Sequence, residues 1–297
     1  MDLSWIFFAV LAAVTQAAFP LLNEYFQVRP LYLMFWMRAF ALAALLPVLL
    51  FLPLPEDPLF YLFVLAGACI FSYFDIVYVG VGASKGAGVV TRIEPLIVGA
   101  TFLIWLAIVP AQIGELAASP LRTAGIVAGF AGSLYFALRL RHCAVSASAL
   151  REMALPIVLG AMGVICGKLA MNHSEALSGT AYYAVFQNLF ALAIYLVILA
   201  LPSVRARLAR EGGDSLFDKK VLLAGAVIAV NWILHTPTKY FAIDQVANPA
   251  YVTVITLTSP LWVLLLYRIA GRQEKADIVS GLGIVFCAAV LVLFSSF

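Results

Sequence analysis

GVGASKGAGVVTRIEPLI, residues 80–97, is a glycine-rich stretch that runs into an apolar helix carrying Arg92, Glu94 and Pro95. If that helix crosses a bilayer, Arg92 and Glu94 lie roughly 10 Å below its surface at about 1.5 Å per residue. An unpaired charge at that depth costs at least ~2.5 kcal/mol. We therefore expect these side chains to line a polar path through the membrane. The alternative is a buried ion pair that only locks helices together.

The composition is that of a polytopic membrane protein. Of the 297 residues, 64% are hydrophobic and 11% are charged, and the mean hydropathy is +1.04. Globular domains are about 45 to 50% apolar and about 25% charged. The net charge of +3 is small and scattered over loops, so no nucleic-acid partner is expected. The four cysteines form no CxxC pair, and we expect neither a cofactor nor a metal.

Apolar runs long enough to span a bilayer predict an all-α fold of about ten transmembrane helices. The first run is retained as a helix rather than as a signal peptide, because Asp2 is the only charge before it. The ten runs cover residues 3–22, 31–52, 58–81, 87–109, 124–138, 153–171, 179–201, 221–243, 246–269 and 278–297.

The second half of the chain echoes the first. With Pro95 set over Pro260, residues 84–95 lie over residues 249–260, and each segment opens a helix after a short turn. Five helices per half is an odd number, so two such repeats lie in the membrane with opposite orientations. The predicted units are residues 1–138, a connector at 139–152, and residues 153–297. Chance similarity between apolar helices is the alternative.

These features resemble the drug/metabolite transporter superfamily, EamA type. The resemblance rests on the two five-helix repeats, a proline part-way along each fourth helix (Pro95, Pro260), Arg38 early in the second helix, and a last helix rich in glycine in each half (Gly125, Gly129, Gly132; Gly281, Gly283). It covers nearly the whole chain. It implies a secondary transporter, often an exporter, of amino acids or other metabolites. The chain differs from the family pattern in carrying Arg92 and Glu94 before Pro95.

The two membrane faces differ in charge. The face opposite the termini carries about thirteen basic residues in its loops, among them Arg29, Arg205, Arg207 and Arg210. The positive-inside rule places that face in the cytoplasm and the termini outside. The family resemblance implies the reverse. Residues 203–218, with three arginines, predict either a short interfacial helix or a solvated loop.

Ionisable residues of the first half gather at one depth, about two turns below the basic face. Because two are positive and two negative, they can neutralise one another as one compensated group. They are Arg38, Asp75, Arg92 and Glu94.

In the second half, Asn231, His235 and Lys239 recur every fourth residue and form a polar stripe on the eighth helix, nearer the other face. For Lys239, as for Lys168 and His173, the simpler interpretation is a helix-end side chain that reaches the headgroups.

We therefore expect a secondary active transporter of a small polar or amphipathic metabolite, with its site between the repeats near the midplane. An arginine could bind a substrate carboxylate through its bidentate fork, and Glu94 or Asp75 could carry a coupling proton. The predicted substrate-binding residues are Gln16, Trp36, Arg38, Tyr78, Arg92, Gln187, Asn231, His235 and Lys239. The predicted hinge residues are Gly82, Gly86, Gly88, Pro95 and Pro260.

Two other functions fit the composition. An intramembrane lipid-modifying enzyme could use His235, Lys239 and Glu94, but the three histidines form no HExxH and no metal-spaced cluster, so we expect no enzyme. A non-transporting membrane partner would need a soluble domain or docking tail. The expected partners are a small-molecule substrate and the lipid bilayer, in the cell (inner) membrane. The sequence leaves the oligomeric state open.

Overall fold

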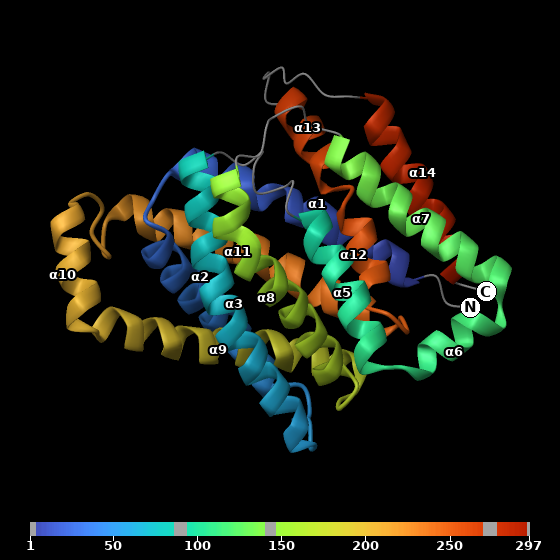
Figure 1. Ribbon diagram of the computed structural model, residues 1–297. Helices are drawn as coiled ribbons and strands as arrows, with labels where there is room; N and C mark the ends of the chain where they lie inside the picture. The colour runs from blue at the N-terminus through green and yellow to red at the C-terminus, as the bar shows by residue number, and fades with distance from the viewer. Residues whose placement is uncertain (1–3, 86–93, 140–146, 270–277, 296–297) are drawn as a thin grey trace.

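The computed structural model describes residues 4–85, 94–139, 147–269 and 278–295. Across these ranges the regular structure is entirely helical (Figure 1). The helices are α1 (Ser4–Phe26), α2 (Pro30–Leu45), the 3-10 helix η1 (Leu46–Leu50), α3 (Pro58–Lys85), α5 (Glu94–Ile108), α6 (Ala111–Ala118), α7 (Pro120–Arg139), α8 (Ala147–Met171), α9 (Ala176–Ala200), α10 (Pro202–Glu211), α11 (Lys219–Asp244), α12 (Ala250–Thr256), α13 (Ser259–Ile269) and α14 (Ile278–Ser295).

Seven helices in the described ranges are long and apolar enough to cross a membrane. The pair α5 and α6, bent by 102° around Pro110, would add an eighth as one broken span. The chain is therefore an all-α polytopic membrane protein. The seven spans are Ser4–Phe26, Pro30–Leu50, Pro58–Val81, Pro120–Arg139, Arg151–Met171, Ala176–Ala200 and Lys219–Asp244.

The outer surface of the bundle is apolar, as lipid contact requires. Leu103 on α5, Val230 on α11 and Phe286 on α14 are 67%, 62% and 70% exposed. Arg38, in contrast, is only 1% exposed in the interior. Apolar side chains outside and a charged side chain inside are the distribution expected when the solvent is a bilayer.

The predicted continuous helix 246–269 is wrong, because it is interrupted at Leu257 and Thr258 between α12 and α13. Proline has no N–H to donate, and its ring clashes with the carbonyl four residues earlier. For Pro260 that carbonyl belongs to Thr256, the last residue of α12. The amides of Leu257 and Thr258 instead bond three residues back, which tightens the end of α12. The break therefore falls beside the predicted hinge proline.

Helices from the two halves of the chain pack against each other in pairs. The main pairs are α7 with α14, α3 with α8, α1 with α11, α2 with α11, α3 with α9, and α2 with α9. A smaller contact joins α5 to α12. In Figure 1, α7 and α14 run side by side along one flank, and α10 lies at the opposite edge of the molecule. The middle of the bundle is thus built from both halves.

Glycines allow α7 and α14 to approach closely. A Cβ atom on Gly129 would lie 2.7 Å from the backbone nitrogen of Leu291 and 2.8 Å from the carbonyl oxygen of Cys287. A Cβ on Gly132 would lie 2.5 Å from Cys287 Sγ. Because the atoms facing Gly129 belong to the backbone, they cannot rotate away. Small residues at this position are what the close contact of two membrane helices needs.

We expect Gly129→Ala to destabilise the protein by about 1 to 3 kcal/mol, the usual cost of overpacking. The matched control is Gly114→Ala in α6, where nothing lies within 4 Å of the new Cβ. The control should be neutral or stabilising by up to ~1 kcal/mol, since alanine favours helix. Melting of the detergent-purified proteins measures both. An unchanged melting temperature for Gly129→Ala would contradict the tight α7–α14 contact.

Candidate central substrate site

A cavity of about 170 Å³, with a mostly apolar wall that also carries ionisable side chains, lies inside the bundle. A water molecule needs ~10 to 15 Å³ of such space, so the cavity has room for on the order of ten waters or a solute of similar size. Helices from both halves of the chain contribute to its wall. The polar lining residues are Gln16, Asn23, Arg38, Asp75, Tyr78, Glu94, Gln187, His235, Thr236, Lys239, Tyr240, Thr253 and Thr256.

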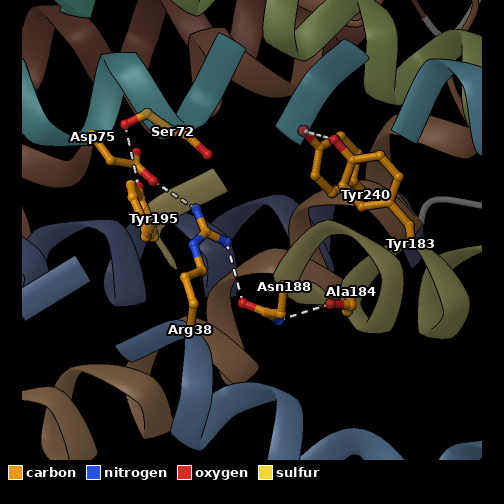
Figure 2. Close-up of polar contacts among 8 residues, drawn as sticks. All are labelled: Arg38, Ser72, Asp75, Tyr183, Ala184, Asn188, Tyr195 and Tyr240. Atoms are coloured by element: carbon orange, nitrogen blue, oxygen red, sulfur yellow. Dashed lines mark hydrogen bonds and ion pairs between the residues drawn. The ribbon is translucent and has the colours of Figure 1, made fainter. Parts of the chain in front are cut away.

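Arg38 and Asp75 form an ion pair between α2 and α3 at the cavity wall. Arg38 Nη2 lies 2.6 Å from Asp75 Oδ2, and Nη1 donates to Asn188 Oδ1 on α9 at 3.3 Å. Figure 2 shows the guanidinium held between these two partners. Its charge also lies 4.8 Å from the centre of the Trp232 ring on α11. Arg38 is therefore largely committed to partners within the protein.

Neutral donors surround Glu94 at the described start of α5. Its Oε1 accepts from Gln16 Nε2 on α1 at 3.1 Å and from the Tyr78 hydroxyl on α3 at 2.6 Å. Its Oε2 accepts from the Ser259 hydroxyl on α13 at 3.3 Å. Three other helices thus contact the carboxyl group at the start of α5. Among the described residues, no cation lies within 4.0 Å of it.

Lys239 is a cation of the cavity without an ion-pair or hydrogen-bond partner among the described residues. Among the residues that the structure covers, its ammonium makes no hydrogen bond and no ion pair within 4.0 Å, although it faces Glu94 and Asp75 across the cavity. The helix-end interpretation of Lys239 is wrong for a geometric reason. Side chains of an α-helix point toward its N-terminus. The Lys239 side chain therefore points away from the C-terminal end of α11 at Asp244 and into the cavity inside the bundle.

The His235 ring is held by α1. Its Nδ1 lies 3.1 Å from the carbonyl oxygen of Ala12 and 3.2 Å from Thr15 Oγ1. A carbonyl only accepts, so we assign the ring proton to Nδ1 and leave Nε2 as an acceptor in the neutral ring.

Several polar atoms in or beside the cavity lack a partner within the described part of the chain. They include Gln187 Oε1 and Arg38 Nε, both buried. Such atoms are costly unless water or a ligand satisfies them. Close by, the hydroxyl of Tyr183 donates to that of Tyr240 at 3.0 Å, as Figure 2 shows. Of the charged groups that line the cavity, Lys239 and Glu94 are the two that form no ion pair within the described residues, and both can meet a polar solute.

Not every residue predicted for the site reaches it. Trp36 is absent from the lining, because its indole donates to the Leu216 carbonyl at 2.6 Å beyond α10. Asn231 also lies elsewhere and donates to the Thr15 carbonyl at 3.1 Å, which fastens α11 to α1. The predictions for Arg92, Gly86 and Gly88 fall outside the described residues. Gly82 lies near the end of α3, Pro95 is buried in α5, and Pro260 lies in α13.

The remaining predicted residues share one cavity. They are Gln16, Arg38, Asp75, Tyr78, Glu94, Gln187, His235 and Lys239. His235 and Lys239, predicted to lie nearer the opposite face, line the same cavity as Asp75 and Glu94. Glu94 bonds to neutral groups rather than to Arg38, so the described members of the predicted four-charge group form a pair and a separate acid.

Sequence reasoning missed two partners of the charged groups, Ser259 and Asn188. Ser259 directly precedes Pro260 and therefore stands over Glu94 in the repeat alignment, a signal that could have identified it. Asn188 is the neighbour of Gln187 and has no comparable signal. It is fully buried, and its amide donates to the Ala184 carbonyl at 2.7 Å, which orients its oxygen toward Arg38.

Two other polar contacts lie away from the cavity. Lys168 donates to the carbonyl of Asp244 at 2.9 Å, joining the ends of α8 and α11. His173 Nδ1 lies 2.7 Å from Asp57 Oδ2, which links the α8–α9 turn to the segment before α3. The Leu59 amide, at 2.9 Å, and then the bond from His173 hold the pKa of the Asp57 carboxyl below its ordinary value of 3.8.

This lowered pKa predicts how the contribution of Asp57 to stability varies with pH. A carboxyl whose pKa is depressed by folding stabilises the protein above its unfolded pKa, and this contribution is lost as pH falls through the folded pKa. We expect Asp57→Asn to lower the melting temperature slightly at neutral pH, and the difference from wild type to close below pH 3.8. Glu56→Gln, at the adjacent exposed acid, is the control. A deficit that persists in acid would exclude this linkage.

Fold and cavity together define the class of the protein: an all-helical polytopic membrane protein with an internal cavity lined by ionisable groups of both signs. No protein-family model matches the chain, and no curated protein matches it in sequence. Its fold is similar to that of a protein solved by crystallography, with a TM-score of 0.67 and 16% sequence identity. The match covers 100% of this chain and 99% of the other. At that identity it shows a shared fold alone.

Proposed function

We propose that the protein is a secondary active transporter, similar to the EamA type of the drug/metabolite transporter superfamily, that moves a small amino-acid-like metabolite across the cell (inner) membrane. The observation that carries the proposal is the central cavity, to which both halves of the chain bring ionisable groups. Midplane sites between repeats are where secondary transporters hold substrate. Export is the direction that the family resemblance favours.

The helix packing supports two inverted repeats. Suppose that the helices of the first half correspond in order to those of the second: α1 to α8, α2 to α9, α3 to α11, α5 to α12 and α7 to α14. Exchanging the two halves then converts the α1–α11 pair into the α8–α3 pair. The α2–α9, α5–α12 and α7–α14 pairs map onto themselves. A two-fold axis in the membrane plane gives this pattern.

A side-chain contact agrees with the same axis. Glu94 and Ser259 are the residues that precede the aligned prolines Pro95 and Pro260, and they hydrogen-bond to each other at 3.3 Å. Residues related by a two-fold axis can meet only where the axis passes. The axis would therefore run beside the cavity, where rocking of one half against the other opens a site to either side in turn.

The charges favour a zwitterionic substrate. Lys239 can bind its carboxylate without breaking an existing bond, whereas Arg38 would have to leave Asp75. A substrate ammonium group would bind the Glu94 carboxylate, which forms no ion pair among the described residues. With Arg38 paired to Asp75, the cavity is near neutral, as a neutral substrate requires.

Uptake of radiolabelled amino acids into proteoliposomes tests the proposal. We expect saturable exchange of at least one amino acid, and Lys239→Met should weaken its binding about 10- to 100-fold, the value of one charge-assisted hydrogen bond. Lys220→Met, an exposed lysine at the start of α11, is the matched control. Absence of flux for every amino acid tried would reject the substrate class, and equal affinity in Lys239→Met would reject the assigned site.

A further inference from the structure

A second hollow, which shares no lining residue with the cavity, lies where α10 packs against α9. This groove has a volume of about 700 Å³. Tyr32 and Phe35 of α2, Leu196 and Leu199 of α9, and Leu208 of α10 form its apolar wall. Leu196 is 52% exposed on the outer surface, so the wall continues into the face that meets lipid tails.

Two arginines lie in the same groove. Arg29 Nη1 donates to the Leu208 carbonyl at 3.0 Å, and its Nη2 is buried without a partner among the described residues. Arg205 Nε donates to the Leu199 carbonyl at 2.9 Å from an exposed position. Within the described ranges, no carboxylate lies within 4.0 Å of either guanidinium. Asp214 also lines the groove, which leaves a net charge of +1.

The position of the groove identifies the kind of anion. Helix α10 is polar on one side, with Arg207 and Arg210 exposed, while Val204 and Leu208 pack against the core. This is the pattern of a helix that lies in the membrane interface. A phospholipid in this groove could place its headgroup on the arginines and an acyl chain on the apolar wall. A free anion would contact only the arginines.

We propose that this groove binds one anionic phospholipid, with its phosphate on Arg29 and Arg205 and an acyl chain along the wall of Tyr32, Phe35 and Leu196. Arginine suits the phosphate because its fork donates two hydrogen bonds at once. The bound lipid bridges α2, α9 and α10, and it thereby ties the α10 segment to the first half of the chain. This inference is independent of what the central cavity transports.

Native mass spectrometry of the full-length protein, with phosphatidylglycerol or phosphatidylcholine titrated into detergent, tests the site. We expect one phosphatidylglycerol to be retained in preference to phosphatidylcholine. Arg205→Gln should weaken that binding roughly fivefold, the typical value of one arginine at an anionic surface. Arg207→Gln, two residues along α10 and outside the groove, should leave binding unchanged.

Asp214→Asn gives a test that misfolding cannot mimic, because removing the groove's acid should tighten binding, by up to roughly fivefold. Equal losses in Arg205→Gln and Arg207→Gln would overturn the site in favour of diffuse attraction to charge. Equal retention of phosphatidylcholine would overturn the role of the arginines. Displacement of the lipid by millimolar inorganic phosphate would show a free-anion site instead.

Discussion

Glu94→Gln should abolish accumulation of substrate driven by a pH gradient and leave exchange of substrate across the membrane intact. Coupling needs a group that takes up and releases a proton at the substrate site, and an amide cannot do so. The amide oxygen can still accept from Tyr78 and Gln16, so the contacts of α5 with α3 and α1 at this position are kept. Weaker hydrogen bonds to a neutral acceptor should cost no more than about 1 to 3 kcal/mol of stability.

Proteoliposomes loaded with substrate distinguish the two activities, since counterflow measures exchange and an imposed pH gradient measures coupling. Glu115→Gln makes the same chemical change on exposed α6 and should behave as wild type. Asp75→Asn is the internal comparison, because Asp75 is the other acid of the cavity. Undiminished gradient-driven uptake by Glu94→Gln would remove this carboxyl from the mechanism. The same result for Asp75→Asn would leave both acids as structural partners.

The helices could be predicted because hydropathy and proline report local properties of the chain. Pro30, Pro58, Pro120 and Pro202 each occupy the first position of a helix, where a missing N–H costs nothing. Hydropathy alone predicts one continuous helix near Pro260, because the apolar sequence continues across the break between α12 and α13. A proline leaves an earlier carbonyl of the helix without its hydrogen-bond donor. Whether the helix kinks or ends there depends on which other groups bond to that carbonyl, and this is decided by tertiary packing.

The cavity could be predicted in its residue types but not in its arrangement. Charges in apolar helices identified Arg38, Asp75, Glu94 and Lys239, because a bilayer tolerates such groups only in the protein interior. Their partners depend on helix rotation and on packing between the halves, which sequence spacing does not fix. Trp36 illustrates the limit, since an aromatic side chain suits a binding site and an interfacial contact equally well.

The Arg38–Asp75 pair should have the largest effect on stability of any side-chain contact described. Removing one partner of a buried pair leaves an uncompensated charge and typically costs about 3 to 5 kcal/mol. The Asp75 side chain keeps 20% exposure, against 2% for Arg38. When Arg38 is replaced, water in the cavity can hydrate the Asp75 carboxylate, whereas the more buried Arg38 cannot be hydrated when Asp75 is replaced. We therefore expect Asp75→Leu to cost more stability than Arg38→Met.

Equilibrium unfolding in mixed micelles measures both single variants and the double variant, Arg38→Met with Asp75→Leu. The double variant leaves neither charge stranded, so its loss should fall short of the summed single losses by about 0.5 to 3 kcal/mol. The matched control is Arg207 and Glu211, an exposed pair on α10 at 3.4 Å, whose coupling should be only about 0.3 to 0.5 kcal/mol. Strictly additive losses at Arg38 and Asp75 would mean that Asn188 and Trp232, rather than Asp75, hold the guanidinium in place.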